Sequence, residues 1–245
     1  MFSYKIAKLP KTSFSKIDVL PDAVFFDYDG TISDNSKYLI KAFKYALKQN
    51  FDKKKDKKLL NEIKKIKNDS DKWLYIKNHC DIQIFEKCNK DYGIFLSTQK
   101  MKKIKGVLKF LKLLKKYKIK VFVISLKDGK GLREELLKAG LLNKYIQDAY
   151  GTLDFGDLQK PSIEFLNAVE NETKTKSKKK WVVGDSYSDV LTALNMKNSK
   201  VFIIDKKDYN KIIENYAKLI GERIFFSSHD RLRKLTKKLK KLQNN

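Results

Sequence analysis

The stretch Phe25-Phe26-Asp27-Tyr28-Asp29-Gly30-Thr31 places two carboxylates at the end of a short apolar run. Asp is a poor strand residue, so two of them directly after Val24–Phe26 need an explanation beyond the turn chemistry of Asp29-Gly30. Both carboxylates can point into one crevice as the chain turns away. Crowded carboxylates repel unless a cation lies between them, and Mg²⁺ prefers oxygen ligands. The stretch therefore predicts a metal-binding strand end.

Similar apolar runs recur along the chain and alternate with amphipathic segments. The other runs are Ile119–Ile124, Trp181–Val183 and Val201–Ile204, with weaker ones at Ile146–Tyr150 and Arg223–Phe226. The helical patterns are Val107–Lys116, Gly131–Ala139, Ser162–Glu170 and Ser188–Leu194. Continuous apolarity is typical of strands that helices cover on both faces. The alternation predicts an α/β fold with a doubly wound parallel sheet and right-handed crossovers.

Residues 36–98 interrupt this rhythm with helical patterns alone. One face carries Leu39, Ala42, Phe43, Ala46 and Leu47, and a second pattern carries Leu60, Ile63 and Ile66. We therefore predict an inserted all-helical cap at 36–98, an α/β core at 23–35 and 99–245, and an N-terminal arm at 1–22. Trp73, Tyr75 and Ile76 are expected to form the core of the insertion rather than to line its inner face.

The C-terminal stretch Asp230–Leu242 carries an apolar stripe among basic residues. The stripe is Leu232, Leu235, Leu239 and Leu242. It predicts a closing helix packed on the sheet. The alternative is a basic helix that lies on a membrane or on nucleic acid.

The formal net charge of +26 invites a nucleic-acid interpretation. Only four residues are Arg, however, and the many Lys residues are spread along nearly the whole chain. A surface that reads phosphates would more often include Arg, whose fork makes bidentate contacts. We therefore expect nucleic acid to bind only through non-specific electrostatic contact.

Other compositional features point to a cytoplasmic protein without membrane contact. Cys80 and Cys88 exclude a disulfide framework and fit a reducing compartment. With His79 they lack the paired spacing of a zinc site. No stretch approaches 18 apolar residues, and the basic N-terminus has no apolar signal region, although it faintly resembles an organellar transit peptide.

Further polar residues follow the predicted strands. Ser125 closes one run, Asp185 follows another, and Lys160 precedes a helix for which Pro161 suits the first position. The carboxyl ends of parallel strands meet at one edge of a sheet, where ligands bind. Acids, a hydroxyl and an ammonium meeting there suit phosphoryl transfer. Each residue also has a structural interpretation, as a turn, a cap or a surface lysine, but all of these together would require several coincidences.

These motifs resemble the haloacid dehalogenase superfamily, in particular its phosphatase branch with a helical cap, similar to phosphoglycolate phosphatases. The resemblance runs from about Ala23 to Ile204. The matching motifs, in family order, are Asp27-x-Asp29-Gly30-Thr31, Ser125, Lys160-Pro161 and Gly184-Asp185-Ser186-Tyr187-Ser188-Asp189. Leu126 departs from the pattern, because relatives often have Asn after the serine.

The resemblance implies a role for each motif residue. Asp27 would be the nucleophile that becomes an aspartyl-phosphate, and Asp29 the general acid and base. Asp27, the main-chain carbonyl of Asp29, and Asp185 would hold Mg²⁺, with Asp189 steadying its water shell. Ser125 and Lys160 would bind the substrate phosphate.

The sequence thus predicts a Mg²⁺-dependent phosphatase that acts on a small phosphorylated metabolite. Asp29 disfavours a dehalogenase or a cation pump, because the former does not need this acid and the latter carry Thr there. A phosphomutase or phosphonatase of the same superfamily stays open, as does a basic polyanion-binding or regulatory protein on this fold. Neither the substrate nor the oligomeric state follows from the sequence.

Overall fold

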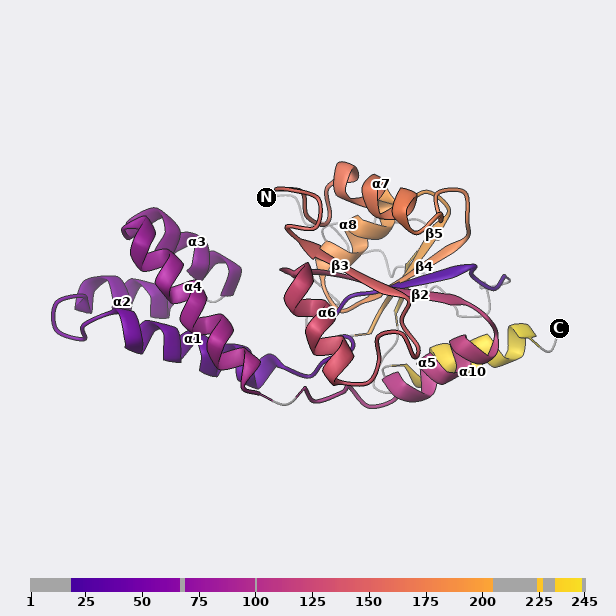
Figure 1. Cartoon of the computed structure of the whole chain (residues 1–245), viewed down its shortest axis with the longest axis horizontal. Coiled ribbons are helices and arrows are strands. Elements are labelled where there is room, and N and C mark those ends of the chain that lie inside the picture. The colour runs from indigo at the N-terminus through magenta and orange to yellow at the C-terminus, as the bar shows by residue number, and fades with distance from the viewer. Residues whose placement is uncertain (1–18, 67–68, 100, 205–223, 227–231, 244–245) are drawn as a thin grey trace, which may run out of the picture. The chain divides into compact units, whose positions relative to one another are not determined.

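The structure is a computed structural model that describes residues 19–66, 69–99, 101–204, 224–226 and 232–243. Its contacts divide the chain into two compact units, Met1–Asp34 with Met101–Asn245, and Asn35–Lys100. The first unit is α/β and the second is helical (Figure 1). Most of the predicted N-terminal arm lies outside the described residues, and so does Arg223.

Six parallel strands form one sheet in the first unit, in the order β3-β2-β1-β4-β5-β6. The strands are β1 (Ala23–Phe26), β2 (Lys120–Asp128), β3 (Asp148–Thr152), β4 (Lys180–Gly184), β5 (Ser199–Ile203) and β6 (Ile224–Phe226). This confirms the predicted parallel sheet. Strand order reverses between β1 and β4, and ligands of such sheets bind beyond the carboxyl ends of the strands at this switch point.

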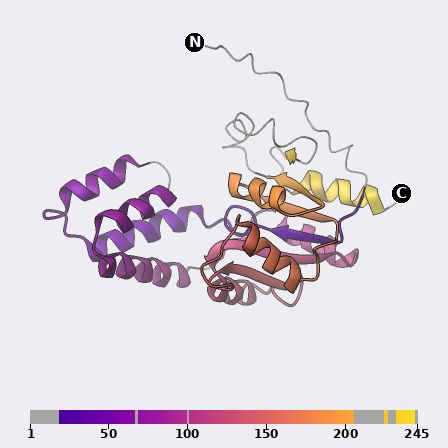
Figure 2. The same cartoon turned by 90° about the horizontal axis from the view of Figure 1, so that it is seen from above.

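Helices cover both faces of the sheet, which confirms the doubly wound architecture (Figure 1). One face carries α5 (Val107–Lys116), α6 (Gly129–Lys138) and α10 (Arg233–Gln243), and the other carries α7 (Ile163–Glu172) and α8 (Tyr187–Asn195). Figure 2 shows the same unit from above, with β1 (indigo) in the middle of the sheet.

The apolar composition of β1 follows from this double cover. Val24 and Phe26 belong to the cluster under α5, whereas Ala23 and Phe25 belong to the cluster under α7. Because successive side chains point to opposite faces, each position must be apolar.

The C-terminal stripe packs on the core, as predicted. Leu232, Leu235 and Leu239 are buried in the cluster that includes the apolar face of α5. The alternative of a basic helix lying on a membrane or nucleic acid is therefore not needed to explain its apolar face.

The second unit consists of α1 (Ser36–Asn50), α2 (Lys57–Lys65), α3 (Asp69–His79) and α4 (Ile82–Ser97). Its own core includes Phe43, Ile63 and Ile76. Trp73 meets the rings of Phe43, Phe85 and Tyr92 edge-on, with centroids 5.1, 6.1 and 5.2 Å away. Trp73 and Ile76 thus build the core of the unit, as expected.

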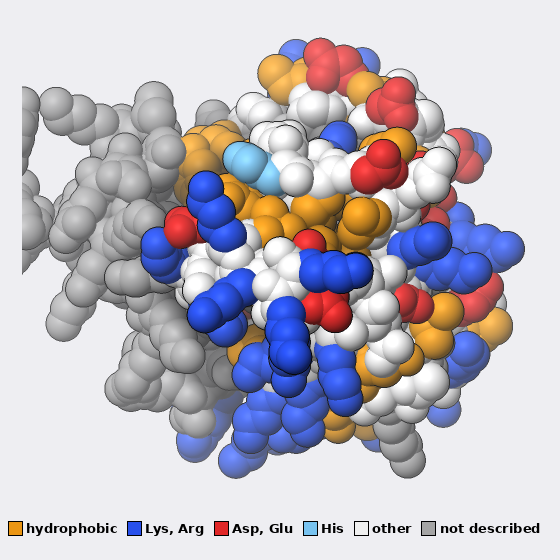
Figure 3. Space-filling view, turned by 90° about the vertical axis from the view of Figure 1, so that its left-hand side faces the viewer, with side chains coloured by type: hydrophobic (Ala, Val, Ile, Leu, Met, Phe, Trp, Pro, Cys, Tyr) orange, Lys and Arg blue, Asp and Glu red, His pale blue; other side chains and the backbone are white. Residues whose placement is uncertain are grey.

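None of the described helices combines the length and apolarity that a membrane crossing requires. In Figure 3 Lys and Arg side chains occur over much of the visible face and are densest toward its lower edge, whereas most carboxylates lie higher up. The basic charge on this face is therefore widespread but uneven.

Candidate active site

The turn after β1 is closed by its own backbone and presents Asp27 at the strand end. Asp27 N donates to Val183 O of β4 at 2.8 Å, and Ile32 N and Ser33 N donate to Tyr28 O at 2.8 and 2.9 Å. Gly30 has φ +82°, and a Cβ there would lie 1.8 Å from Asp185 Oδ2. Only glycine fits this approach, which brings the first and fourth motifs together.

Lys160 is buried between two carboxylates. Its Nζ lies 2.5 Å from Asp27 Oδ1 and 3.0 Å from Asp189 Oδ1, and only 3% of the residue is exposed. The alternative of a surface lysine is therefore wrong. The prediction for Pro161 is also wrong: α7 begins at Ile163 with Ser162 as its N-cap, so Pro161 precedes the helix. The Ser162 hydroxyl accepts from Phe165 N, which is the capping bond that starts α7.

Asp189 shapes the start of α8 and holds Lys160 at the same time. Its Oδ2 accepts from Asp185 N at 3.2 Å, from Ser186 N at 3.0 Å and from Ser186 Oγ at 2.7 Å. Its Oδ1 accepts from Lys160. A Cβ on Gly184 would clash with this carboxyl group at 2.1 Å. Asp189 thus combines the predicted first-turn helix role with a contact to Lys160.

Three acids, two of them after strand ends and one in the first turn of α8, could hold a cation here. Asp27, Asp185 and Asp189 each offer a carboxylate oxygen, and these oxygens all lie within 4.8 Å of one another. An oxygen-only donor set of this size suits a hard divalent cation such as Mg²⁺. Both oxygens of Asp189 already accept hydrogen bonds, which suits holding the site more than binding the ion itself.

Negative charge is in excess around the ammonium. Burial raises the pKa of Asp27 to about 7, although Lys160 opposes the rise, and the charge of Asp189 adds to it. Burial alone would lower the pKa of Lys160, but Asp189 and Asp27 together hold that pKa above its usual range. A divalent cation would relieve the crowding of the carboxylates.

Ser125 and Asp29 lie at the same edge of the sheet. Ser125 is buried, and its Oγ accepts from Lys127 N at 3.2 Å. It does not end its strand as predicted, because β2 continues to Asp128. Regular pairing with β3 is nevertheless interrupted between Ile124 and Asp128, so Ser125 lies where the ladder becomes irregular. Asp29 is half-buried in the turn, and its charge adds to the rise of the Asp27 pKa.

Two contacts that involve residues beside the site correspond to no sequence motif. Asn195 Nδ2, at the end of α8, donates to Pro161 O at 2.7 Å and holds the loop that carries Lys160. The phenol of Tyr28 donates to Glu135 Oε2 of α6 at 2.6 Å. The pattern that predicted the acidic residues, a polar residue directly after an apolar run, cannot predict such contacts.

The residues considered for zinc do not form a metal site within the described part of the chain. His79 stacks on the ring of Tyr75 at 4.0 Å, and Cys88 is buried in the helical core. No group of potential ligands among the described residues includes them.

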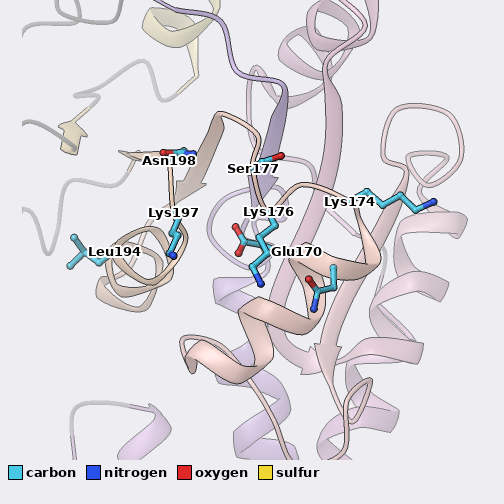
Figure 4. Close-up of a pocket in the computed structure, with 8 residues that line it drawn as sticks. Glu170, Lys174, Lys176, Ser177, Leu194, Lys197 and Asn198 are labelled. Atoms are coloured by element: carbon cyan, nitrogen blue, oxygen red, sulfur yellow. The ribbon is translucent and has the colours of Figure 1, made fainter.

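A cleft of about 710 Å³ lies at the other edge of the sheet (Figure 4). It is lined by Glu170, Asn171, Lys174, Lys176, Ser177, Leu194, Lys197 and Asn198. These residues precede β4 and β5 and surround the last turns of α7 and α8, whose partial negative charge suits lysines. None of the predicted site residues lines this cleft, so it is not the candidate active site.

Comparisons with known proteins give one family and several similar folds. The sequence matches the model of the haloacid dehalogenase-like hydrolases over residues 24–204. A predicted phosphatase from Clostridium acetobutylicum is 18% identical, with 91% of this chain and 100% of that one covered and a TM-score of 0.65. A predicted phosphoglycolate phosphatase from Haemophilus somnus is 18% identical, with 74% and 84% covered and a TM-score of 0.58.

A third similar structure contains a ligand. A variant of CbbY from Rhodobacter sphaeroides, in complex with xylulose-1,5-bisphosphate, is 11% identical, with 76% and 87% covered and a TM-score of 0.57. At these identities the three likenesses confirm the fold alone. A search of curated proteins finds no match.

Proposed function

The chain belongs to the haloacid dehalogenase-like hydrolases, and on this premise we propose that it is a Mg²⁺-dependent phosphatase of small phosphorylated metabolites that acts in the cytoplasm. The observation that carries the proposal is the buried ammonium of Lys160 between Asp27 and Asp189, with Asp185 close by. Phosphoryl transfer needs positive charge beside a nucleophilic oxygen, and this arrangement supplies it.

In the proposed reaction a carboxylate oxygen of Asp27 attacks the phosphorus atom, and the ester oxygen leaves. Asp29 protonates that leaving oxygen. Asp29 then removes a proton from the water that attacks the aspartyl-phosphate, which releases phosphate and restores the Asp27 carboxylate. Asp29 lies two residues beyond the nucleophile on the same closed turn, which supports its assignment to both half-reactions.

The remaining residues bind the phosphoryl group and the cation and neutralise negative charge. Lys160 offsets the charge of Asp27 and of the phosphoryl oxygens, and the Ser125 hydroxyl donates to one of those oxygens. Asp27, Asp185 and the main-chain carbonyl of Asp29 would hold Mg²⁺, which supplies further charge neutralisation when bound. Asp189 keeps Lys160 and the start of α8 in place.

Similar structures support a small phosphorylated substrate. The Clostridium and Haemophilus proteins are described as predicted phosphatases, and the Rhodobacter protein was solved with a sugar bisphosphate. We assign residues 36–98 the role of the helical cap that phosphatases of this branch carry. The residues of such caps select the substrate, which we propose to be a phosphorylated metabolite.

Release of phosphate from an aryl phosphate tests the proposal. We expect hydrolysis that requires Mg²⁺, stops with a chelator and is lost in Asp27→Asn. Asp157→Asn is the matched control, because Asp157 is exposed and none of the proposed roles falls on it. A protein that binds nucleic acid tightly in a salt-sensitive manner, unchanged in Asp27→Asn and without hydrolysis, would instead be the polyanion-binding alternative.

A panel of phosphorylated metabolites then identifies the substrate class. The best substrate is expected to raise kcat/KM well above the aryl phosphate value, because binding energy from the rest of the molecule adds to catalysis. Uniformly low values for the whole panel would contradict a metabolite phosphatase.

A further inference from the structure

Three side chains form a hydrogen-bonded network beside the candidate active site. The phenol of Tyr28 donates to Glu135 Oε2 at 2.6 Å, and the ammonium of Lys127 donates to Glu135 Oε1 at 2.5 Å. The same ammonium lies 5.0 Å from the centre of the Tyr28 ring. Both oxygens of Glu135 are engaged, so this residue joins α6 to the ends of β1 and β2.

The network lies where backbone pairing between β1 and β2 stops. The register ends at Phe26 and Val123. Tyr28 and Ser125 come two residues later on the two segments. Side chains, instead of ladder hydrogen bonds, therefore connect the segment that carries Asp27 to the segment that carries Ser125.

Tyr28 links this network to the turn that carries both acids of the first motif. It lies between Asp27 and Asp29 in the chain and has no exposed surface. A buried phenol needs a hydrogen-bond partner, and this one comes from a residue 107 positions further along the chain. Because the main-chain oxygen of Tyr28 also closes the turn, fixing its ring fixes the turn.

Lys127 extends the same control to the phosphate-binding hydroxyl. Its main-chain N–H donates to Ser125 Oγ at 3.2 Å, while its ammonium is held by Glu135. Anchoring the end of this side chain restrains the peptide that orients Ser125. Charge-assisted hydrogen bonds of this kind are stronger than neutral ones.

We propose that Glu135 is a positioning residue for phosphoryl transfer. By binding Tyr28 and Lys127 together, it holds the Asp27 turn and the Ser125 hydroxyl at a fixed separation. The inference rests on the proposed function and adds a residue that lies outside all four motifs. If Glu135 served only to attach α6 to the sheet, its loss would lower stability without changing the turnover of folded protein.

The test compares Glu135→Gln, Tyr28→Phe and the double variant with the control Glu134→Gln. Glu134 is the exposed neighbour of Glu135 on the same helix, and Tyr28→Phe removes a single oxygen atom. Three quantities are measured: kcat and KM for an aryl phosphate, the melting temperature, and calorimetric affinity for inorganic phosphate in Mg²⁺.

Each single variant is expected to lower kcat about tenfold, the size of effect that loss of one charge-assisted hydrogen bond allows, with KM nearly unchanged. The kcat of the double variant is expected to be no lower than that of the less active single variant, because both changes break the same hydrogen bond between Tyr28 and Glu135. Phosphate affinity, like KM, should change little in the same variants, and Glu134→Gln should match the wild type in all three quantities.

Two outcomes contradict the inference and can be told apart from failure of the proposed function. If the wild type hydrolyses the aryl phosphate and Glu135→Gln and Tyr28→Phe keep its kcat, only the positioning role is overturned. Additive losses of kcat in the double variant overturn the same role. A wild-type protein that neither hydrolyses the aryl phosphate nor binds phosphate overturns the proposed function, and the positioning role with it.

Discussion

Two buried lysines at opposite edges of the same sheet have different charge surroundings. At the amino edge, Lys180 Nζ lies 2.7 Å from Glu170 Oε1 and donates to main-chain oxygens of Thr175 and Lys176 at 2.9 and 3.3 Å. One ammonium there meets one carboxylate. At the carboxyl edge, Lys160 meets two carboxylates, and Asp185 adds a third acid within reach.

The difference shows that burial of a charged pair does not by itself mark a functional site. The Lys180 pair is balanced in charge, and the ammonium also binds two backbone oxygens. The Lys160 cluster carries more negative than positive charge and lies at the switch point of the sheet. An excess of carboxylate oxygens is what a divalent cation can use, and such a cation would in turn attract a phosphoryl group.

Removing one carboxylate from each pair should give the largest contrast. Asp27→Asn is expected to lower kcat at least about a thousandfold, because the amide cannot form the covalent intermediate. Glu170→Gln should keep kcat within about twofold but destabilise the fold by about 3 kcal/mol, because it leaves Lys180 buried without a counter-charge. Kinetics and chemical denaturation measure both. Comparable kcat losses would remove the distinction between the two edges.

Replacing each ammonium should sharpen the same contrast. Lys160→Met is expected to lower kcat about a hundredfold, since the charge that offsets Asp27 and the phosphoryl group is lost. Lys180→Met should retain turnover per folded molecule and lower the melting temperature. Activity normalised to folded protein by circular dichroism separates the two effects. Full activity of Lys160→Met would show that its ammonium is only structural.

Mg²⁺ binding should stabilise the folded protein only through the acidic site at the carboxyl edge of the sheet. At about ten times its dissociation constant, Mg²⁺ is expected to raise the melting temperature by about 3–5 °C. Asp185→Asn should abolish the shift, whereas Glu170→Gln should keep it. A thermal shift assay with and without Mg²⁺ measures this. A shift that survives Asp185→Asn would place the cation elsewhere.

The smallest predicted effect is a pH dependence of metal affinity. Because the pKa of Asp27 in the metal-free site is raised to about 7, protons compete with the cation below that pH. The same shift makes the metal-free fold less stable as pH rises from about 4 to 7, since the folded state binds the extra proton in that range. Calorimetric titrations with Mg²⁺ should show affinity increasing between pH 6 and about 8. Constant affinity would contradict the raised pKa.

The fold was largely predictable because doubly covered strands must be apolar at every position. Val24–Phe26 and Trp181–Val183 therefore stand out from the surrounding lysines. The end of β2 was not predictable, because Lys127 and Asp128 are polar strand residues in an irregular part of the pairing with β3. An apolar run ends at Ser125, whereas the strand does not.

The candidate site was predictable to the extent that strand ends carry it. Asp27, Asp185 and Lys160 meet because the carboxyl ends of parallel strands and the loops beside them share one edge. The bonds from Asn195 to Pro161 and from Tyr28 to Glu135 join residues 34 and 107 positions apart. Such contacts leave no local pattern, so only the folded chain reveals them.

Trapping the covalent intermediate tests the central claim most directly. The protein is mixed with acetyl phosphate and Mg²⁺, quenched in acid and reduced with borohydride, which converts an aspartyl-phosphate to homoserine. Peptide mass spectrometry should then find homoserine at position 27 and unmodified Asp at positions 29 and 185. Homoserine at another aspartate, or none at all while phosphate is still released, would contradict Asp27 as the nucleophile.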